Sequence, residues 1–192
     1  PALTAAEWAE VVAHVREYYL AYARRPFFEA ARLHSPGFNK TVLGMCTIGV
    51  LALAIAEELP DAELDAAVSE AIRSAYGYAR EALDDDGGAY EGPGFGAVCI
   101  SAVLQLAEAL RRHGLDGLSH YEPLFQHALW LSSMLAPGGG TLSIGDSTGP
   151  DNIFPTILLL AEWRNDAGLR SAYRQGLGRP DHRNGPYGDS FE

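Results

Sequence analysis

The chain has 192 residues, 47% hydrophobic and 20% charged, which is typical of a folded domain rather than a disordered segment. Its formal net charge of -11 disfavours nucleic-acid binding, because that function needs clustered basic residues against phosphates. The same charge repels anionic polymers at long range, so an acidic ligand would need a locally basic site. Lys40 is the only lysine in the sequence.

The residue pattern gives no support for metal, cofactor or membrane functions. The two cysteines, Cys46 and Cys99, form no CxxC pair, and no Cys/His cluster has the spacing of zinc ligands. The longest apolar run, residues 42–56, is shorter than the roughly 18–20 residues that a transmembrane helix needs. We therefore expect no metal, no cofactor and no membrane span. Because Pro1 leads almost directly into a helix, we expect a mature or truncated chain.

The N-terminal residues predict one long helix. Thr4 and Glu7 have the spacing of a capping box, in which each residue satisfies an N–H group at the start of the helix. The apolar residues that follow at helical spacing are Trp8, Val11, Val12, Val15, Tyr18, Tyr19 and Tyr22. The sequence Arg-Arg-Pro at 24–26 ends this helix, and residues 26–37 are predicted to form a loop.

Two later helices are apolar nearly all round, so we expect both to be buried on all sides. They lie near residues 38–59 and 95–112, the second one after a predicted turn at 91–94. The helix between them, at 61–83, has charged residues on one side only and therefore predicts one wet face. Further predicted elements are helices at 119–135, 151–164 and 166–176 and a short extended piece at 141–144.

The alternation of fully buried helices with one-faced helices predicts the architecture. Simple up-down bundles do not require it, because every helix there keeps an outer face, whereas two concentric layers of helices do. We therefore predict an all-α fold, an incomplete (α/α) toroid of about three helical hairpins over residues 1–177, with a loose tail at 178–192. An open ring exposes apolar edges, which we expect the rest of a longer chain or a homo-oligomer to cover.

Three short motifs occur in order along the chain. Asn39-Lys-Thr opens the first apolar helix, Asp86-Gly-Gly-Ala-Tyr-Glu-Gly-Pro-Gly-Phe-Gly precedes the second, and Gly145-Asp-Ser follows later. Their order and spacing over residues 36–150 resemble those of the heparinase II/III-like polysaccharide lyases. That family carries Asn followed by His or Trp at the head of an apolar helix, then a D-G-x-x-x-E-G-P-x-Y-type turn, then G-D-S. The resemblance implies β-elimination on uronic-acid polymers such as glycosaminoglycans or alginate.

In the chemistry that the resemblance implies, an Asn neutralises the C5 carboxylate, a His or Tyr removes the C5 proton and a Tyr protonates the leaving oxygen. Asn39 matches the Asn of the family. The candidate catalytic residues are Asn39, Lys40, Tyr90 and Glu91. The candidate substrate-binding residues are His34, Phe95, Asp146 and Tyr22. In a toroid, the starts of the inner helices gather at one end of the cleft, where their N–H groups suit an anionic ligand.

Two departures from the family pattern bear on catalysis. Phe95 stands where the family often carries Tyr, and a phenylalanine cannot transfer a proton. Lys40 stands where relatives carry His or Trp, and it acts as a base only if burial lowers its pKa toward 7. Otherwise Lys40 pairs with a carboxylate as a point charge. His34 is a further candidate for the missing base.

Structural roles also fit these residues. Asn39 suits a helix N-cap, Lys40 suits a plain surface position, and Glu91 suits the N-terminus of the next helix. Cys46 and Cys99 are predicted to be buried thiols that form no disulfide, because helix axes lie roughly 8–10 Å apart. Three histidines spaced seven apart are predicted to be surface residues: His113, His120 and His127.

Two other functions stay open. One is a catalytically weakened glycan-binding module on the same scaffold, which Phe95 and Lys40 favour. The other is a toroidal glycoside hydrolase that uses Glu91 and Asp146 as acid and base, which needs the two carboxylates about 5–10 Å apart. In each case we expect the partner to be an acidic polysaccharide or oligosaccharide. A lyase of this kind would be secreted or periplasmic.

Overall fold

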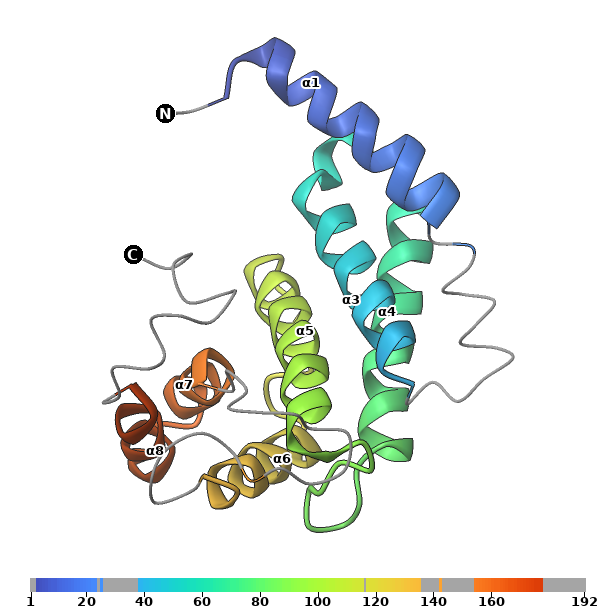
Figure 1. Ribbon diagram of the computed structural model, residues 1–192. Coiled ribbons are helices and arrows are strands. Elements are labelled where there is room, and N and C mark those ends of the chain that lie inside the picture. The colour runs from blue at the N-terminus through green and yellow to red at the C-terminus, as the bar shows by residue number, and fades with distance from the viewer. Residues whose placement is uncertain are drawn as a thin grey trace. The chain divides into compact units, whose positions relative to one another are not determined.

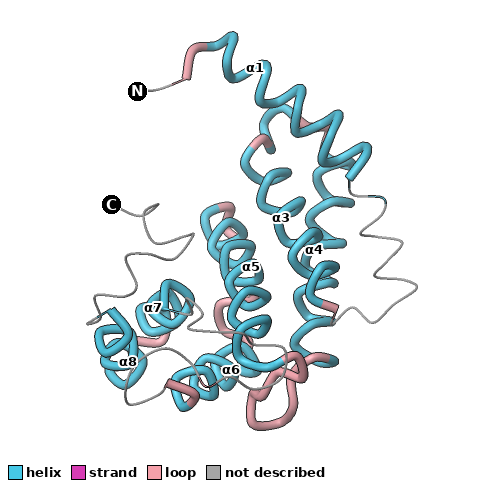
Figure 2. The backbone as a smooth tube through the Cα atoms, in the orientation of Figure 1, coloured by secondary structure: helices cyan, strands magenta, loops and turns pink. Residues whose placement is uncertain are grey.

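The computed structural model describes residues 3–23, 25, 38–115, 117–135, 142 and 154–177. These residues form helices joined by turns, and no strand occurs among them, which confirms the predicted all-α class (Figure 1; Figure 2). The predicted loop at 26–37, the extended piece at 141–144 apart from Leu142, and the tail at 178–192 lie outside the described residues.

The chain divides into two compact units. The first comprises residues 1–82 and 102–120, and the second comprises residues 83–101 and 121–192. Helix α5 (Gly92–Arg112) contributes its first half to the second unit and its second half to the first.

The first unit begins with helix α1 (Ala5–His14), which starts at the predicted capping box. Thr4 Oγ1 accepts a hydrogen bond from the backbone N–H of Glu7 at 3.3 Å, and the Glu7 carboxylate accepts one from the backbone N–H of Thr4 at 2.7 Å. The bond from the Thr4 backbone, and then the one from its hydroxyl, lower the pKa of Glu7. Two reciprocal hydrogen bonds between Thr4 and Glu7 therefore stabilise the start of α1.

The predicted long helix continues as a π-helix, η1 (Val15–Ala23), instead of as an α-helix. A π-helix bonds residues five apart, and Val15 and Leu20, five apart, are both buried. Tyr18, which α-helical spacing groups with the apolar residues, is 50% exposed. The expectation of a continuous α-helical stripe was therefore wrong over this segment, because the winding changes which residues share a face.

Helices α3 (Asn39–Ala54) and α4 (Asp61–Glu81) form a hairpin through the short 3₁₀ turn η2 (Ala56–Glu58) (Figure 1). The two helices approach closely at Gly49. A Cβ atom at this position would lie 2.5 Å from Cβ of Ala71 and 2.9 Å from Cδ1 of Leu106. Glycine at 49 thus sets how near the helices of this unit can pack.

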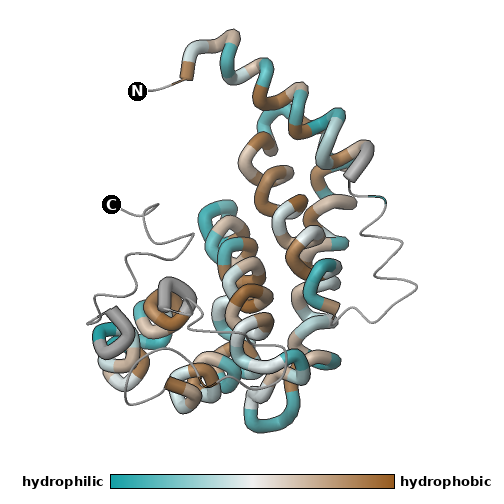
Figure 3. Tube along the Cα trace, viewed as in Figure 1, coloured by the Kyte–Doolittle hydropathy of each residue, from teal (hydrophilic) through white to brown (hydrophobic). Residues whose placement is uncertain are grey.

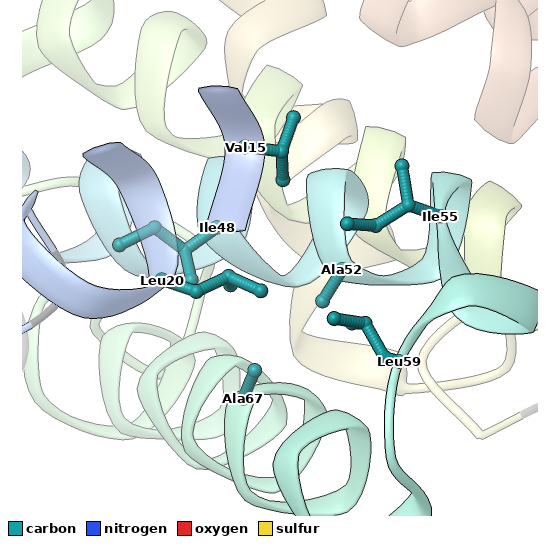
Figure 4. Close-up of a cluster of buried hydrophobic side chains, with 7 residues drawn as sticks. All are labelled: Val15, Leu20, Ile48, Ala52, Ile55, Leu59 and Ala67. Carbon is teal, nitrogen blue, oxygen red and sulfur yellow. The ribbon is translucent and has the colours of Figure 1, made fainter. Parts of the chain in front are cut away.

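A buried apolar cluster joins η1 to this hairpin (Figure 4). Its members come from η1, α3, the two residues that flank η2, and α4: Val15, Leu20, Ile48, Ala52, Ile55, Leu59 and Ala67. Trp8 packs against the cluster from α1, and its Nε1 donates a hydrogen bond to Glu58 Oε1 at 3.3 Å. The N-terminal helices are therefore fixed to the hairpin mainly by apolar burial.

Helix α3 is mostly apolar (Figure 3) and largely buried, but not on all sides as expected. Thr47 and Ala54 are exposed, while Leu43 and Val50 are half-buried. These four residues lie at helical spacing, so they form one partly exposed strip. Helix α4 has an exposed face, as its charge pattern predicts, although Glu63 and Glu70 are half-buried. Its exposed residues are Asp61, Ala62, Asp65, Ser69, Arg73, Arg80 and Glu81.

The second unit contains α6 (Glu122–Ser133), α7 (Phe154–Trp163), α8 (Ala167–Leu177) and the first half of α5. Helices α7 and α8 are joined by a short turn in which Asp166 Oδ1 accepts a hydrogen bond from the N–H of Leu169 at 2.8 Å. Arg164 links this hairpin to α6, because it lies over the ring of Phe125 at 5.0 Å and pairs with Glu122 at 3.2 Å.

Among the described residues, α5 is the helix that is long and apolar enough to cross a membrane. Of its most apolar window, 61% is buried inside the protein. A core helix of a folded domain passes the same test of length and composition, so this is weak evidence for a membrane span.

Replacing Gly49 with alanine should destabilise the protein. In a helix interior this change normally stabilises by about 1 kcal/mol, but here the added methyl collides with Ala71, and overpacking costs about 1–3 kcal/mol. Urea unfolding measures the difference. Thr47→Ala, on the exposed strip of the same helix, is the control and should stay within about 0.5 kcal/mol of wild type. A stabilised Gly49→Ala protein would contradict the close packing.

Candidate functional site

Asn39 and Lys40 are the first two residues of α3. Asn39 is 7% exposed, and Lys40 is exposed. The N-cap of α3 is Phe38, whose backbone is extended, so Asn39 is not the cap that its residue type favours. Because Lys40 is exposed, the site lacks the burial that a lysine base needs, and the role of a point charge fits this position better.

Thr41 follows these residues and is fully buried. Its hydroxyl oxygen has no hydrogen-bond partner among the described residues. A buried polar group without a partner costs about 1–3 kcal/mol. The Thr41 hydroxyl is therefore a buried polar group near the start of α3 whose partner does not lie among the described residues.

In the second unit, residues 83–91 form a closed turn in front of α5. Leu83 and Ala89 pair as an isolated antiparallel bridge, and the N–H of Asp84 donates to the carbonyl of Gly88 at 3.0 Å. The Asp84 carboxylate in turn accepts a hydrogen bond from the N–H of Gly88. Gly87 has a φ of 86°, which residues with a side chain rarely adopt.

This turn lies directly against helix α6. A Cβ atom at Gly87 would lie 2.4 Å from the carbonyl carbon of Gln126, so the approach requires a glycine. The Nδ1 atom of His127 lies 2.6 Å from the carbonyl oxygen of Gly87. A carbonyl oxygen can only accept a hydrogen bond, so Nδ1 carries the proton.

The ring of His127 also contacts α5 and its own helix. A Cβ atom at Gly96 would lie 2.9 Å from Cε1 of His127, so the ring occupies the space beside that glycine. On the α6 side, the ring stacks on Trp130, with centroids 5.6 Å apart and planes 16° apart. His127 therefore touches both ends of the segment 87–96.

The burial of His127 corrects the prediction that it is a surface residue. It is 0% exposed, whereas His113 and His120 are exposed as predicted. A sequence signal existed, because His127 lies three residues after Leu124 and four before Leu131. Both leucines are fully buried, so the histidine falls on the apolar face of α6.

Burial lowers the pKa of His127, because a charged ring is costly in an apolar environment. The carbonyl groups of Gly87 and Gly96 and the carboxylate of Asp84 raise it by less. The ring is therefore neutral at pH 7, with its proton on Nδ1. A neutral buried donor bonded to a backbone carbonyl is a stable structural contact rather than a general acid.

The turn ends at Tyr90, which is 74% exposed, and at Glu91, which is half-buried. Helix α5 starts at Gly92, three residues before the predicted start, so the expected turn at 91–94 is largely the first helical turn. Proline at 93 is compatible with that position, because the first turn leaves N–H groups unbonded. The sequence Gly-Pro-Gly therefore opens the helix instead of delaying it.

Phe95 is 37% exposed and Val98 is 46% exposed. They lie three residues apart on α5, so they share a face of that helix. Tyr90 is exposed as well, just before the start of this helix.

The other predicted residues are less informative. His34 and Asp146 lie outside the described residues, and the side chain of Tyr22 on η1 is not described. The distance between Glu91 and Asp146 is therefore untested, and the glycoside hydrolase stays a prediction. Asn39 and Lys40 belong to the first unit, whereas Tyr90, Glu91 and Phe95 belong to the second. Their meeting at one site therefore stays a prediction.

Cys46 and Cys99 are both fully buried thiols, as predicted. No group of three or more His, Cys, Asp or Glu side chains within the described residues could hold a metal ion.

In comparisons with known proteins, no family model, no curated protein and no solved structure matches this chain. The likeness to heparinase II/III-like lyases therefore depends on the three sequence motifs alone.

The buried neutral histidine predicts that stability falls in mild acid. The pKa of His127 is lower in the folded protein than its ordinary value of 6.5, so below about pH 6.5 the unfolded chain takes up a proton that the folded chain does not. The loss is at most about 1.4 kcal/mol per pH unit. Hydrogen bonds from Arg111, then Arg112, hold the pKa of Glu108 at about 2, so that group stays charged throughout this window.

Urea unfolding at a series of pH values between 7 and 5 tests this expectation. The free energy of unfolding should fall more steeply for wild type than for His127→Asn, which has no titrating ring. Parallel curves for the two proteins would show that His127 is not buried in the neutral form.

Replacing Gly87 with alanine should cost more than the same change at Gly114. Both glycines have a positive φ, of 86° and 74°, so each alanine pays a backbone strain of about 1–2 kcal/mol. Only at Gly87 does the new Cβ meet the backbone of α6, whereas nothing lies within 4 Å of it at Gly114. Denaturant unfolding should show a further loss of about 1–3 kcal/mol for Gly87→Ala. Equal losses would mean that the turn does not lie against α6.

Proposed function

We propose that this chain is a segment of an (α/α) toroid of the heparinase II/III type and acts in β-elimination on uronic-acid-containing polysaccharides. The main support is where the two motif-bearing helices begin. Helix α3 starts at Asn39, and helix α5 starts directly after Glu91. Helix N-termini present unbonded N–H groups and partial positive charge, which favour an anionic ligand.

The position of Asn39 supports the role that the resemblance implies for it. Its amide is buried at the start of α3 but does not cap that helix, so the commonest structural reason for an asparagine there does not apply. In the proposed reaction, this amide binds the C5 carboxylate and stabilises the negative charge that develops as the C5 proton leaves. Lys40, exposed beside it, would pair with a uronate carboxylate of the same polymer.

Tyr90 and Glu91 are the proposed proton-transfer groups. The base takes the C5 proton, the electron pair forms the C4–C5 double bond, the C4–O bond breaks, and the acid protonates the leaving oxygen. Phe95 cannot supply that proton, so the exposed phenol of Tyr90 takes the role that a tyrosine at 95 has in the family. Phe95 and Val98 would then offer an apolar surface to a sugar ring.

A second candidate is a glycan-binding module that retains the scaffold without turnover. Two observations favour it. Phe95 carries no transferable proton, and Lys40 is exposed, whereas a lysine that acts as a base is usually buried. The two candidates share the ligand class and differ only in whether product forms.

Incubating the full chain with alginate, heparan sulfate and chondroitin sulfate separates these functions. A lyase should give rising ultraviolet absorbance from unsaturated uronate, and Asn39→Ala should lower the rate about 10²–10³-fold, as removal of a charge-stabilising group does. Lys40→Ala should mainly raise KM. Arg73→Ala, an exposed cation on α4, is the control and should behave as wild type.

Binding of oligouronates that Lys40→Ala abolishes, without any product, would select the binding module. If no polymer is bound or cleaved by the wild-type chain, both candidates are wrong.

A further inference from the structure

The turn that carries Tyr90 and Glu91 has a sequence that does little to order its backbone. Three consecutive carboxylates, of Asp84, Asp85 and Asp86, are exposed and repel one another, and two glycines follow. Glycine loses the most backbone entropy on ordering, so this sequence favours the disordered state. Hydrogen bonds connect Asp84 to Gly87 and Gly88, and the N–H of Gly92 donates to the carbonyl of Ala89 at 2.9 Å.

The contacts that oppose this tendency come from α6. At Gly87 the turn touches the backbone of Gln126, and its carbonyl accepts the Nδ1–H of His127. This hydrogen bond is fully buried, so water cannot replace it when it breaks, and the donor would be left unsatisfied at a cost of about 1–3 kcal/mol.

The same ring also fixes the other end of the segment. It fills the space beside Gly96 in the second turn of α5, where a Cβ would also lie 3.0 Å from that of Ala89. Gly87 and Gly96 lie on either side of Tyr90, Glu91 and Phe95 in the chain. One buried side chain thus contacts both ends of the segment that presents the candidate proton-transfer groups.

We propose that His127 is a positioning residue, which holds the Tyr90–Glu91 segment in place between α6 and the start of α5 without touching substrate. Its effect on turnover rests on the proposed function, whereas its hold on the turn does not. Around the ring, Trp130 stacks on its face, the backbone of Gly96 lies beside it, and Asp84 is bonded to Gly88.

Two substitutions of nearly the same shape separate the hydrogen bond from the filling of space. His127→Asn keeps an N–H donor close to the position of Nδ1, and His127→Leu has none. His113→Leu, at an exposed histidine, is the control for loss of an imidazole.

Amide hydrogen exchange of the full chain is the first measurement. In His127→Leu, the amides of Gly87 and Gly88 should exchange roughly 10-fold faster or more, because a buried hydrogen bond is lost. Amides of Val42 and Met45 in α3 should exchange as in wild type. His127→Asn should return the turn to within about threefold of wild type. Unchanged exchange in His127→Leu, or equal exchange in both variants, would overturn the proposal.

Turnover of oligouronates is the second measurement. His127→Leu should lower kcat about 10- to 100-fold with little change in KM, as a small displacement of catalytic groups does, and His127→Asn should restore most of it. A loss of turnover that His127→Asn does not restore would contradict the positioning role. If Gly87 exchanges faster in His127→Leu but the wild-type chain has no turnover, His127 still orders the turn and the proposed function is wrong.

Gly87→Ala provides a variant in which His127 is intact. The added methyl meets the backbone of α6 and should move the turn away, so Gly88 should again exchange faster and turnover should again fall. Gly114→Ala, with a positive φ and open space around it, should change neither. Slow exchange at Gly88 in Gly87→Ala would overturn the proposal even if His127→Leu does not fold.

Discussion

The buried hydrogen bond from His127 to the carbonyl of Gly87 is the contact on which the second unit's candidate site depends. It joins two residues 40 positions apart in the chain, and it does so inside the protein, where no water can replace either partner. The turn that it fixes is acidic and rich in glycine, so its own sequence supplies little order. We propose that this contact, added to the Leu83–Ala89 bridge, holds the segment of Tyr90 and Glu91 in place before α5.

Glycine makes the decisive close approach in both units. At Gly49 it lets α3 pack onto α4, and at Gly87 it lets a turn pack onto the backbone of α6. The second approach also needs a positive φ, so it depends on glycine for two reasons. Gly49 lies in α3, the helix that begins with Asn39, and Gly87 lies in the turn that leads to Tyr90 and Glu91. The segments that pack most closely are therefore the ones that carry the motif residues.

The sequence predicted those features that depend on local pattern. The capping box at Thr4 and Glu7 and the wet face of α4 could be predicted because each depends on residues less than two helical turns apart. The π-helical winding at Val15–Ala23 could not, because a sequence of aromatic and apolar residues fits either winding and packing decides between them. The early start of α5 was missed because Gly-Pro-Gly usually forms a turn, although proline also suits a first helical turn.

For the candidate site, the start of α3 near Asn39 could be predicted from the sequence, but the contacts that hold the segment before α5 could not. A shift of one residue in the start of α3 decides whether Asn39 is a cap or a residue within the helix, and helix ends are the least certain part of any pattern. His127 was predicted to be a surface residue because the three histidines seven apart lack ligand spacing, although its place between Leu124 and Leu131 indicated burial. Its partner, Gly87, could not be predicted, because it is distant in sequence and accepts through a backbone atom. Only the fold brings the two together.

The protonation state of the His127 ring tests this account most directly. Long-range ¹H–¹⁵N correlation spectra of the full chain, with ¹⁵N-labelled histidine, report it for each of the six histidines, and His127→Asn identifies the signal. We expect the ring of His127 to be neutral at pH 7 with its proton on Nδ1, because burial lowers its pKa and the carbonyl of Gly87 accepts the Nδ1–H bond. A ring at 127 that carries its proton on Nε2, or that is charged at pH 7, would contradict the buried hydrogen bond to Gly87.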